Sequence, residues 1–164
     1  MLTLVPAITR KDDIEKEMRK MYYGGRMFYL SGWNGNWMPE IVDCPDDSKF
    51  QYAIVNDRQD LIGYLDYHVN WYNSSASQFG IVAFKRGYGI INNIFSKEIR
   101  KLIYEHHIHR IEWRMIEGNH IEAEYDSICK KYKGSKHVLK DYVKDKYGNY
   151  HNDIIYEIII EQGE

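Results

Sequence analysis

The chain has 164 residues, a length typical of one domain, and its 22 lysines and arginines against 24 aspartates and glutamates leave a formal net charge of −2. This balance excludes the strongly basic surface of most nucleic-acid-binding domains, and the two widely separated cysteines argue against a disulfide scaffold or a thiolate zinc site. The chain has neither a signal-peptide pattern nor an apolar run near the roughly 18 residues that a membrane span needs. We therefore expect one cytoplasmic domain over residues 1–164, without a membrane segment.

Hydrophobic patterning predicts alternating strands and helices along the chain. Apolar residues alternate in the expected strands and recur at helical spacing in the expected helices. The strands are expected at 2–5, 50–55, 61–72, 78–84, 110–116, 138–143 and 153–160, and the helices at 14–22, 90–105 and 121–132. The predicted fold class is α/β, with a mixed, mostly antiparallel sheet in which helix 90–105 crosses over between two neighbouring parallel strands.

A candidate anion-binding loop joins the strand that ends near Phe84 to helix 90–105. Its residues are Lys85, Arg86, Gly87, Tyr88, Gly89, Ile90 and Ile91. A helix start exposes unsatisfied N–H groups with partial positive charge, and here the first acidic side chain of the helix is Glu98, so an external anion would satisfy it. A dinucleotide fingerprint is disfavoured because Asn92 replaces its third glycine, and no Walker motif follows. The alternative is an ordinary turn with a surface arginine.

The residues of this loop carry a family resemblance. Arg86–Ile91 is similar to the Arg/Gln-x-x-Gly-x-Gly/Ala pyrophosphate loop of the GNAT acyltransferase superfamily. His109–Arg114, followed by Glu117–Asn119, resembles the fifth strand and following asparagine of those proteins. Gly148–Asn152 with Tyr156 resembles the last hairpin of the branch that acetylates ribosomal-protein N-termini. The order of the predicted elements agrees with that fold over nearly the whole chain.

The resemblance implies a GNAT-like sheet with helices on both faces and acetyl-CoA as cosubstrate, without a metal. It implies direct attack of a primary amine on the thioester, the amine being a protein or peptide N-terminus, a lysine or a small amine. The cofactor-binding residues that it implies are Val82, Ala83, Lys85, Arg86, Gly87, Tyr88, Gly89, Ile90, Ile91 and Asn119. Ile91 stands where the family has glycine or alanine, which motivates an alternative function, a module that binds CoA or a partner without turnover.

Acetyl transfer needs a group that takes a proton from the amine and one that gives a proton to the leaving thiolate. The family uses a tyrosine about seven residues after its asparagine, but position 126 is aspartate here, so Tyr125 and Tyr132 are both candidates for the acid. Both lie on the apolar stripe of their helix, and plain core packing is the alternative. Asp66 and His68 share the polar face of a central strand and are candidates for the base, unless that face is merely solvated.

The irregular stretch from residue 24 to residue 48 carries a candidate acceptor site. Trp33 and Trp37 offer apolar walls and cation–π faces. Four acidic residues and no basic one follow between positions 40 and 47, namely Glu40, Asp43, Asp46 and Asp47. In the resembling family the region after the first helix helps to form the acceptor side, so we expect Trp33, Trp37, Asp43, Asp46 and Asp47 to attract a cationic acceptor. An ordinary solvated loop is the alternative.

Two further features invite other functions. The cluster His106, His107 and His109 has no matching cysteine or carboxylate pattern, so we expect no metal. Lysines and tyrosines interleave over residues 130–146, which motivates a nucleic-acid-binding alternative, but aspartates dilute this stretch and favour a solvated hairpin. The oligomeric state stays open, a homodimer included.

Overall fold

The computed structural model describes residues 1–23, 39–43 and 46–161, so Trp33 and Trp37 lie outside the described residues. Its elements are β1 (Leu2–Pro6), the 3₁₀ turn η1 (Ala7–Arg10), α1 (Lys11–Tyr23), β2 (Lys49–Asn56), β3 (Leu61–Asn70), β4 (Ser75–Ala83), the π-helical turn η3 (Ile91–Phe95), α2 (Ser96–Tyr104), β5 (Arg110–Ile116), α3 (Glu122–Lys131), β6 (Ser135–Lys144) and β7 (Tyr150–Ile159). The predicted order of strands and helices is confirmed. No helix in the described ranges is long and apolar enough to cross a membrane.

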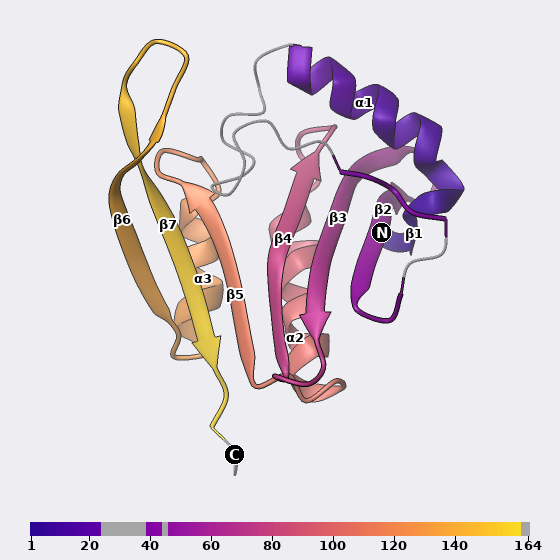
Figure 1. Cartoon of the computed structure of the whole chain (residues 1–164). Helices are drawn as coiled ribbons and strands as arrows, with labels where there is room; N and C mark the ends of the chain where they lie inside the picture. Colours follow the sequence, from indigo (N-terminus) through magenta and orange to yellow (C-terminus); the bar gives the residue numbers. More distant parts are fainter. Residues whose placement is uncertain (24–38, 44–45, 162–164) are drawn as a thin grey trace.

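The described strands form one seven-stranded sheet in the order β1-β2-β3-β4-β5-β7-β6. Neighbouring strands are antiparallel except β4 and β5, which are parallel and joined by η3 and α2. The predicted mixed sheet with one helical crossover is therefore confirmed. Figure 1 shows α2 and α3 on one face of the sheet and α1 on the other.

Two apolar clusters hold these layers together. On the face covered by α2 and α3, Trp113 on β5 stacks on Tyr156 of β7 with ring centroids 5.3 Å apart. Phe95 of η3 and Tyr125 of α3 pack edge-on against this pair, with centroid separations of 5.5–5.9 Å, and their own ring centroids are 5.2 Å apart. Such aromatic pairs add about 0.5–1.5 kcal/mol each beyond the area they bury. On the opposite face α1 packs Ile14 and Met18 against β2, β3 and β4.

The two parallel strands in the middle of the sheet separate after a short contact. β4 and β5 pair only at Ser75 with Arg110 and at Ala76 with Ile111. Beyond Ala76 no residue of β4 pairs with β5, and Figure 1 shows the two strands diverging toward the end where α2 begins. Backbone N–H and C=O groups along that edge of β4 therefore have no partner in the neighbouring strand, which is the usual way a sheet satisfies them.

A β-bulge lies at the point of separation. The register of β3 with β4 moves from His68–Ser77 to Asp66–Gly80, so β4 holds one extra residue there. Gln78, inside this stretch, has a backbone φ of 56°, in the left-handed region. A bulge bends its strand and increases its twist, and we attribute the divergence of β4 from β5 to this one.

Candidate functional site

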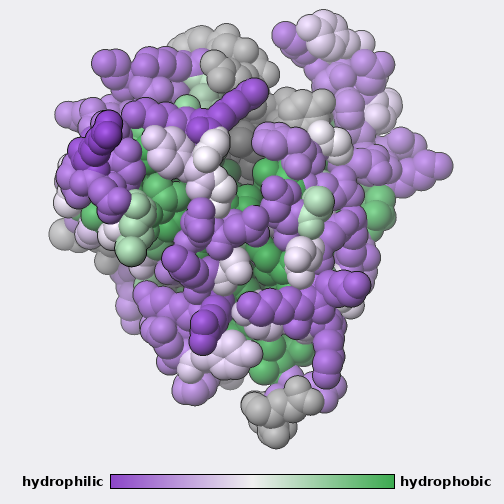
Figure 2. Space-filling view, turned by 180° about the vertical axis from the view of Figure 1, so that it is seen from behind, coloured by the Kyte–Doolittle hydropathy of each residue, from purple (hydrophilic) through white to green (hydrophobic). Residues whose placement is uncertain are grey.

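A cavity of about 450 Å³ lies between β4 and β5 where they diverge. β4 lines it with Phe79, Ile81 and Ala83, and the start of the following helix lines it with Ile90 and Ile91. Seen from the face that α2 and α3 cover, apolar side chains appear in the middle of the molecule, bordered by polar ones (Figure 2). The cavity is thus a mostly apolar slot beside the unpaired edge of β4.

The other wall of the cavity is more polar. Arg114 of β5 and Asn119, from the loop before α3, line it together with Tyr125 of α3. Met21, near the end of α1, also lines it. Because α1 covers one sheet face and α3 the other, the lining draws on both faces of the sheet. Two reactants entering from opposite faces would meet beside β4.

The loop at the end of β4 places an uncapped helix start at this cavity. Ile90, the residue before η3, makes no side-chain capping hydrogen bond, and the first helical turn holds no acidic residue. Arg86 lines the cavity beside Ile90 and Ile91. Free helical N–H groups and a nearby guanidinium form an arrangement that binds phosphate groups.

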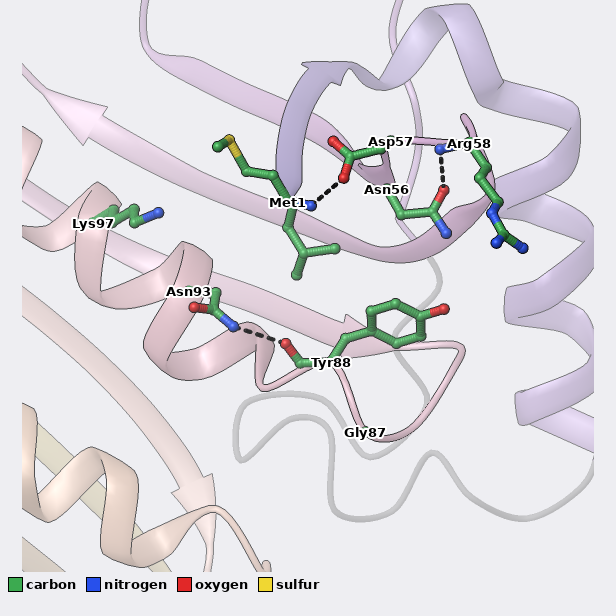
Figure 3. Close-up of a pocket in the computed structure, with 9 residues that line it drawn as sticks. Met1, Asn56, Asp57, Arg58, Gly87, Tyr88, Asn93 and Lys97 are labelled. Atoms are coloured by element: carbon green, nitrogen blue, oxygen red, sulfur yellow. Dashed lines mark hydrogen bonds and ion pairs between the residues drawn. The ribbon is translucent and has the colours of Figure 1, made fainter.

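The other side of the same loop lines a second pocket of about 420 Å³. Figure 3 shows Gly87 and Tyr88 on one side of it and the N-terminal end of the chain on the other, where the ammonium group of Met1 pairs with Asp57. The Asn93 amide donates a hydrogen bond to the carbonyl oxygen of Tyr88 at 2.9 Å. This contact ties the loop to the first turn of the helix and fixes its shape from behind.

The structure brings together only part of the set expected to hold the cofactor. Ala83, Arg86, Ile90, Ile91 and Asn119 line the cavity. Three others do not line it: Gly87 and Tyr88 line the second pocket, and the ammonium group of Lys85 lies 3.9 Å from the carboxylate of Asp60. The Val82 side chain is buried against the α1 cluster and its carbonyl oxygen faces Gly63 of β3, so that residue does not line the cavity.

The two tyrosines proposed as acids are separated by the length of α3. Tyr125 lies in the first turns and lines the cavity, and burial raises the pKa of its hydroxyl, which keeps it protonated. Tyr132 follows the last turn and does not line the cavity. Its hydroxyl is buried, without a hydrogen-bond partner among the described residues. The geometry favours Tyr125.

The two residues proposed as bases lie on the sheet face that α1 covers. Asp66 is 8% exposed and does not itself line the cavity, but it stands opposite Gly80 of β4, the strand that borders it. Burial raises the pKa of the Asp66 carboxyl to about 7, a value suited to a base at neutral pH. His68 is partly buried and lies further along β3, opposite Ser77 and toward the paired end of β4 and β5. Asp66 is the better placed of the two.

The described acidic residues of the expected acceptor segment lie apart from one another. Asp43 is exposed and lies 3.8 Å from Lys11 at the start of α1. Asp46 accepts hydrogen bonds from Ser48 and from the Lys49 N–H, and the Ser48 contacts lower the pKa of its carboxyl. The carbonyl oxygen of Asp47 accepts a hydrogen bond from the indole of Trp71, in the turn after β3. Asp46 and Asp47 therefore sit near the paired end of β4 and β5, and their role with an acceptor stays a prediction.

No protein-family model matches the chain, and no curated protein sequence matches it. Solved structures do. A spermidine N-acetyltransferase from Vibrio cholerae, in complex with CoA and spermine, has a TM-score of 0.64 at 14% identity, with 96% of this chain and 95% of that chain covered. A ribosomal-protein-S5-alanine acetyltransferase from Vibrio fischeri has a TM-score of 0.61 at 14% identity, covering 99% and 94%. The fold is the GNAT fold.

A third structure, of a probable acetyltransferase, has 20% identity and a TM-score of 0.54 over 69% of this chain. This chain spans 63% of that one. The resemblance of the loop and strands to the GNAT superfamily is therefore confirmed at the level of fold. The resemblance of the last hairpin to the ribosomal-protein branch stays a prediction.

The GNAT fold explains one departure of this sequence from the family pattern. Asp126, at the position expected for the tyrosine, points away from the cavity, because its carboxylate accepts hydrogen bonds from Tyr156 at 2.7 Å and from Lys136 at 2.8 Å. These partners lie on β7 and β6. Asp126 thus ties α3 to the outer strands, while the neighbouring Tyr125 lines the cavity.

Several lining residues of the cavity were not predicted as site residues, among them Arg114 and Met21. Arg114 lies on β5 between buried residues, so in the sequence it looks like a solvent-facing position of an amphipathic strand, although it lines the cavity. Met21 belongs to the apolar stripe of α1, a pattern that predicts a core residue, but it lines the cavity. Among the described residues, no group of three or more His, Cys, Asp or Glu is arranged to hold a metal ion.

Proposed function

We propose that this chain is an acetyl-CoA-dependent N-acetyltransferase that acts on a primary amine. The observation that carries the proposal is the cavity between the diverging parallel strands β4 and β5, closed at one end by an uncapped helix start. This arrangement places an unpaired strand edge, an apolar cavity and an anion-binding helix start next to one another. The acetyltransferase structures that share the fold support the same activity.

The residues present fit CoA as the cosubstrate. The N–H and C=O groups of Ala83 face the edge of β4 that has no strand partner, where an amide-containing chain such as pantetheine finds donors and acceptors, whereas those of Val82 face β3. Arg86 and the N–H groups at Ile90 and Ile91 suit a pyrophosphate. When bound, the thioester supplies an activated acetyl group.

The chain's own groups then divide the proton transfers. Asp66 is the base that takes a proton from the amine, since its carboxyl titrates near neutral pH on the α1 face. Tyr125 keeps its proton at neutral pH and donates a hydrogen bond toward the leaving sulfur. N–H groups of the unpaired β4 edge are available to the oxygen on which charge develops. Holding the reactants in register contributes several kcal/mol more.

The acceptor is proposed to be a cationic primary amine. Two proteins with this fold are described as acting on spermidine and on an alanine of a ribosomal protein, and one was crystallised with spermine. The chain's exposed Asp43 and the segment of Trp33 and Trp37 are the proposed acceptor side. A polyamine, a lysine and a peptide N-terminus all carry the positive charge that such residues attract before one amine loses its proton.

Thiol release from acetyl-CoA tests the proposal. The wild-type chain is assayed with spermidine, a lysine-containing peptide and peptides with free N-termini, while calorimetry measures CoA affinity. We expect CoA binding and amine-dependent release of CoA with at least one class. Micromolar CoA binding with no turnover on any amine would favour the binding-module alternative, which Ile91 in the cavity wall motivates. Absence of CoA binding would contradict both.

Gly89→Val is expected to weaken CoA binding by about tenfold or more. Gly89 has a φ of +57°, and a Cβ there would stand 3.3 Å from the Asn93 amide, so a branched side chain strains the loop and displaces Asn93. Gly148→Val is the matched control, because Gly148 also has a positive φ, +90°, but lies in the turn between β6 and β7. Calorimetry showing equal CoA affinity for folded Gly89→Val and Gly148→Val would contradict this placement of the pyrophosphate.

Tyr125→Phe is expected to lower kcat by about 100-fold while leaving CoA affinity unchanged. Phenylalanine keeps the ring packed against Phe95 and Trp113 and removes the hydroxyl alone. Tyr132→Phe should keep the wild-type kcat, because that hydroxyl lies outside the cavity. Steady-state kinetics decide between them. A Tyr125→Phe variant with the wild-type rate would leave protonation of the thiolate to water.

A further inference from the structure

A chain of buried hydrogen bonds leads to Asp66 from the segment that precedes β2. The hydroxyl of Tyr64 donates to Oδ2 of Asp66 at 3.1 Å, and Tyr64 is fully buried. Oδ1 of Asp66 is also buried and has no hydrogen-bond partner among the described residues. The N–H of Gly80 on β4 also acts on the carboxylate and lowers its pKa, but Oδ1 makes no hydrogen bond of its own among the described residues, which is costly in a buried site unless this oxygen has a use.

Gln51 of β2 determines which way the Tyr64 hydroxyl points. Its Nε2 donates to the Tyr64 oxygen at 2.9 Å and to the carbonyl oxygen of Glu40 at 2.8 Å, while its Oε1 accepts from the N–H of Val42 at 3.1 Å. The Val42 contact assigns the orientation of the amide, since only an oxygen accepts from that N–H. Because Gln51 donates to the Tyr64 oxygen, the proton of the hydroxyl is directed to Asp66.

We propose that Tyr64 and Gln51 are positioning residues that orient Asp66 through Oδ2 and leave Oδ1 to accept the proton of the acceptor amine. This inference rests on the proposed function, in which Asp66 is the base. The far end of the chain of hydrogen bonds is the main chain of Glu40 and Val42, next to the proposed acceptor side. The packing of residues 40–42 against β2 is thereby coupled, through Gln51 and Tyr64, to the orientation of the Asp66 carboxylate.

Few charged groups face Asp66 from the elements packed around it. Lys49 of β2 acts on it electrostatically, and Tyr64 is its hydrogen-bond partner on β3. β4 presents Gly80, and the described part of α1 presents the apolar Ile14 and Met18 to this face. Burial disfavours the carboxylate, and the Tyr64 hydroxyl stabilises it more than the Gly80 N–H or Lys49 does. Loss of this hydroxyl should therefore raise the pKa of Asp66.

The direct test is the titration of Asp66 in the whole chain, read by the 13C signal of its side-chain carboxyl. In Tyr64→Phe we expect the pKa of Asp66 to rise by about one unit from its wild-type value. The matched control is Tyr67→Phe. Tyr67 lies on the same strand, is buried, and donates to the carboxylate of Glu98 at 3.0 Å, but on the opposite face. Its replacement should leave the Asp66 titration and kcat as in wild type.

Kinetics supply the second readout. The pH at which kcat/KM reaches half its plateau should rise by about one unit in Tyr64→Phe, and kcat at pH 7 should fall by about fivefold, with KM for acetyl-CoA unchanged. Gln51→Leu should raise the pKa of Asp66 less. The double variant Gln51→Leu/Tyr64→Phe should match Tyr64→Phe, because Gln51 acts through the hydroxyl.

Two results would overturn the inference while the proposed function stands. One is an Asp66 titration that Tyr64→Phe leaves unmoved in an active enzyme. The other is a Gln51→Leu shift that persists at full size in the Tyr64→Phe background, which would show that Gln51 acts by another route. Absence of acetyl transfer by the wild-type chain would instead overturn the proposed function, since the titration does not depend on turnover.

Discussion

Asp66→Asn is expected to lower kcat/KM by about 100-fold or more, the usual contribution of a general base. Asparagine keeps the size of the side chain and an oxygen that accepts from Tyr64, but it takes no proton from the amine. Kinetics at pH 8 with saturating acetyl-CoA and subsaturating amine measure the loss. Asp141→Asn, which removes an exposed carboxylate on β6, is the control and should keep wild-type kinetics.

The same variant should be more stable than wild type at high pH. The pKa of Asp66 is 3.8 in the unfolded chain and is raised by burial to about 7, so the folded state binds the proton more tightly. The free energy of unfolding is therefore unaffected by this group below pH 4, and it falls as the pH rises from 4 through 7. Asp66→Asn escapes that loss, and its advantage at pH 8 should be on the order of 3 kcal/mol and vanish near pH 4. Urea unfolding at both pH values measures it, and equal stability at pH 8 would contradict the buried carboxylate.

Much of the fold was predictable because each element carries a clear local pattern. Strand 110–116 was predicted with its observed bounds, and the loop before α2 was recognised from Arg86 and two glycines. The β4 bulge was not predictable in the same way. Ala76 and Phe79 pack on the same side although they lie three residues apart, since the extra residue shifts the alternation. The expected strand therefore began at Gln78, three residues after the true start of β4.

The site was predictable in residue type more than in position. Tyr125 and Tyr132 lie seven residues apart on one helical stripe, so the sequence does not separate them. In the structure about 10 Å along the helix axis separates the two tyrosines, and only Tyr125 lines the cavity. For the acidic segment, the sequence predicted the charge but not the position in the fold. Its charge pattern was evident, but hydrogen bonding to Trp71 places Asp47 at the far end of the sheet, which depends on tertiary pairing.

Asp153→Ala is expected to lower the free energy of unfolding by about 3–5 kcal/mol, the typical cost of removing one partner of a buried ion pair. Nη2 of Arg114 lies 2.7 Å from Oδ2 of Asp153, and the two side chains are 8% and 0% exposed. The guanidinium carbon also lies 5.6 Å from the ring centroid of Tyr142 on β6. Without the carboxylate, the guanidinium in the cavity wall loses this buried ion pair. The midpoint of thermal unfolding should fall by about 10 °C.

A double variant shows whether charge or packing causes the loss. Arg114→Met/Asp153→Ala removes both charges and keeps a long apolar side chain beside Tyr142, so it should regain most of the stability that Asp153→Ala loses. Urea unfolding of wild type, both single variants and the double variant at one pH completes the cycle. If the double variant is as unstable as Asp153→Ala, the carboxylate acts through packing, and the charge-compensation argument fails. If it regains stability but loses amine turnover with CoA affinity unchanged, Arg114 belongs to the acceptor wall of the cavity as well as to the core.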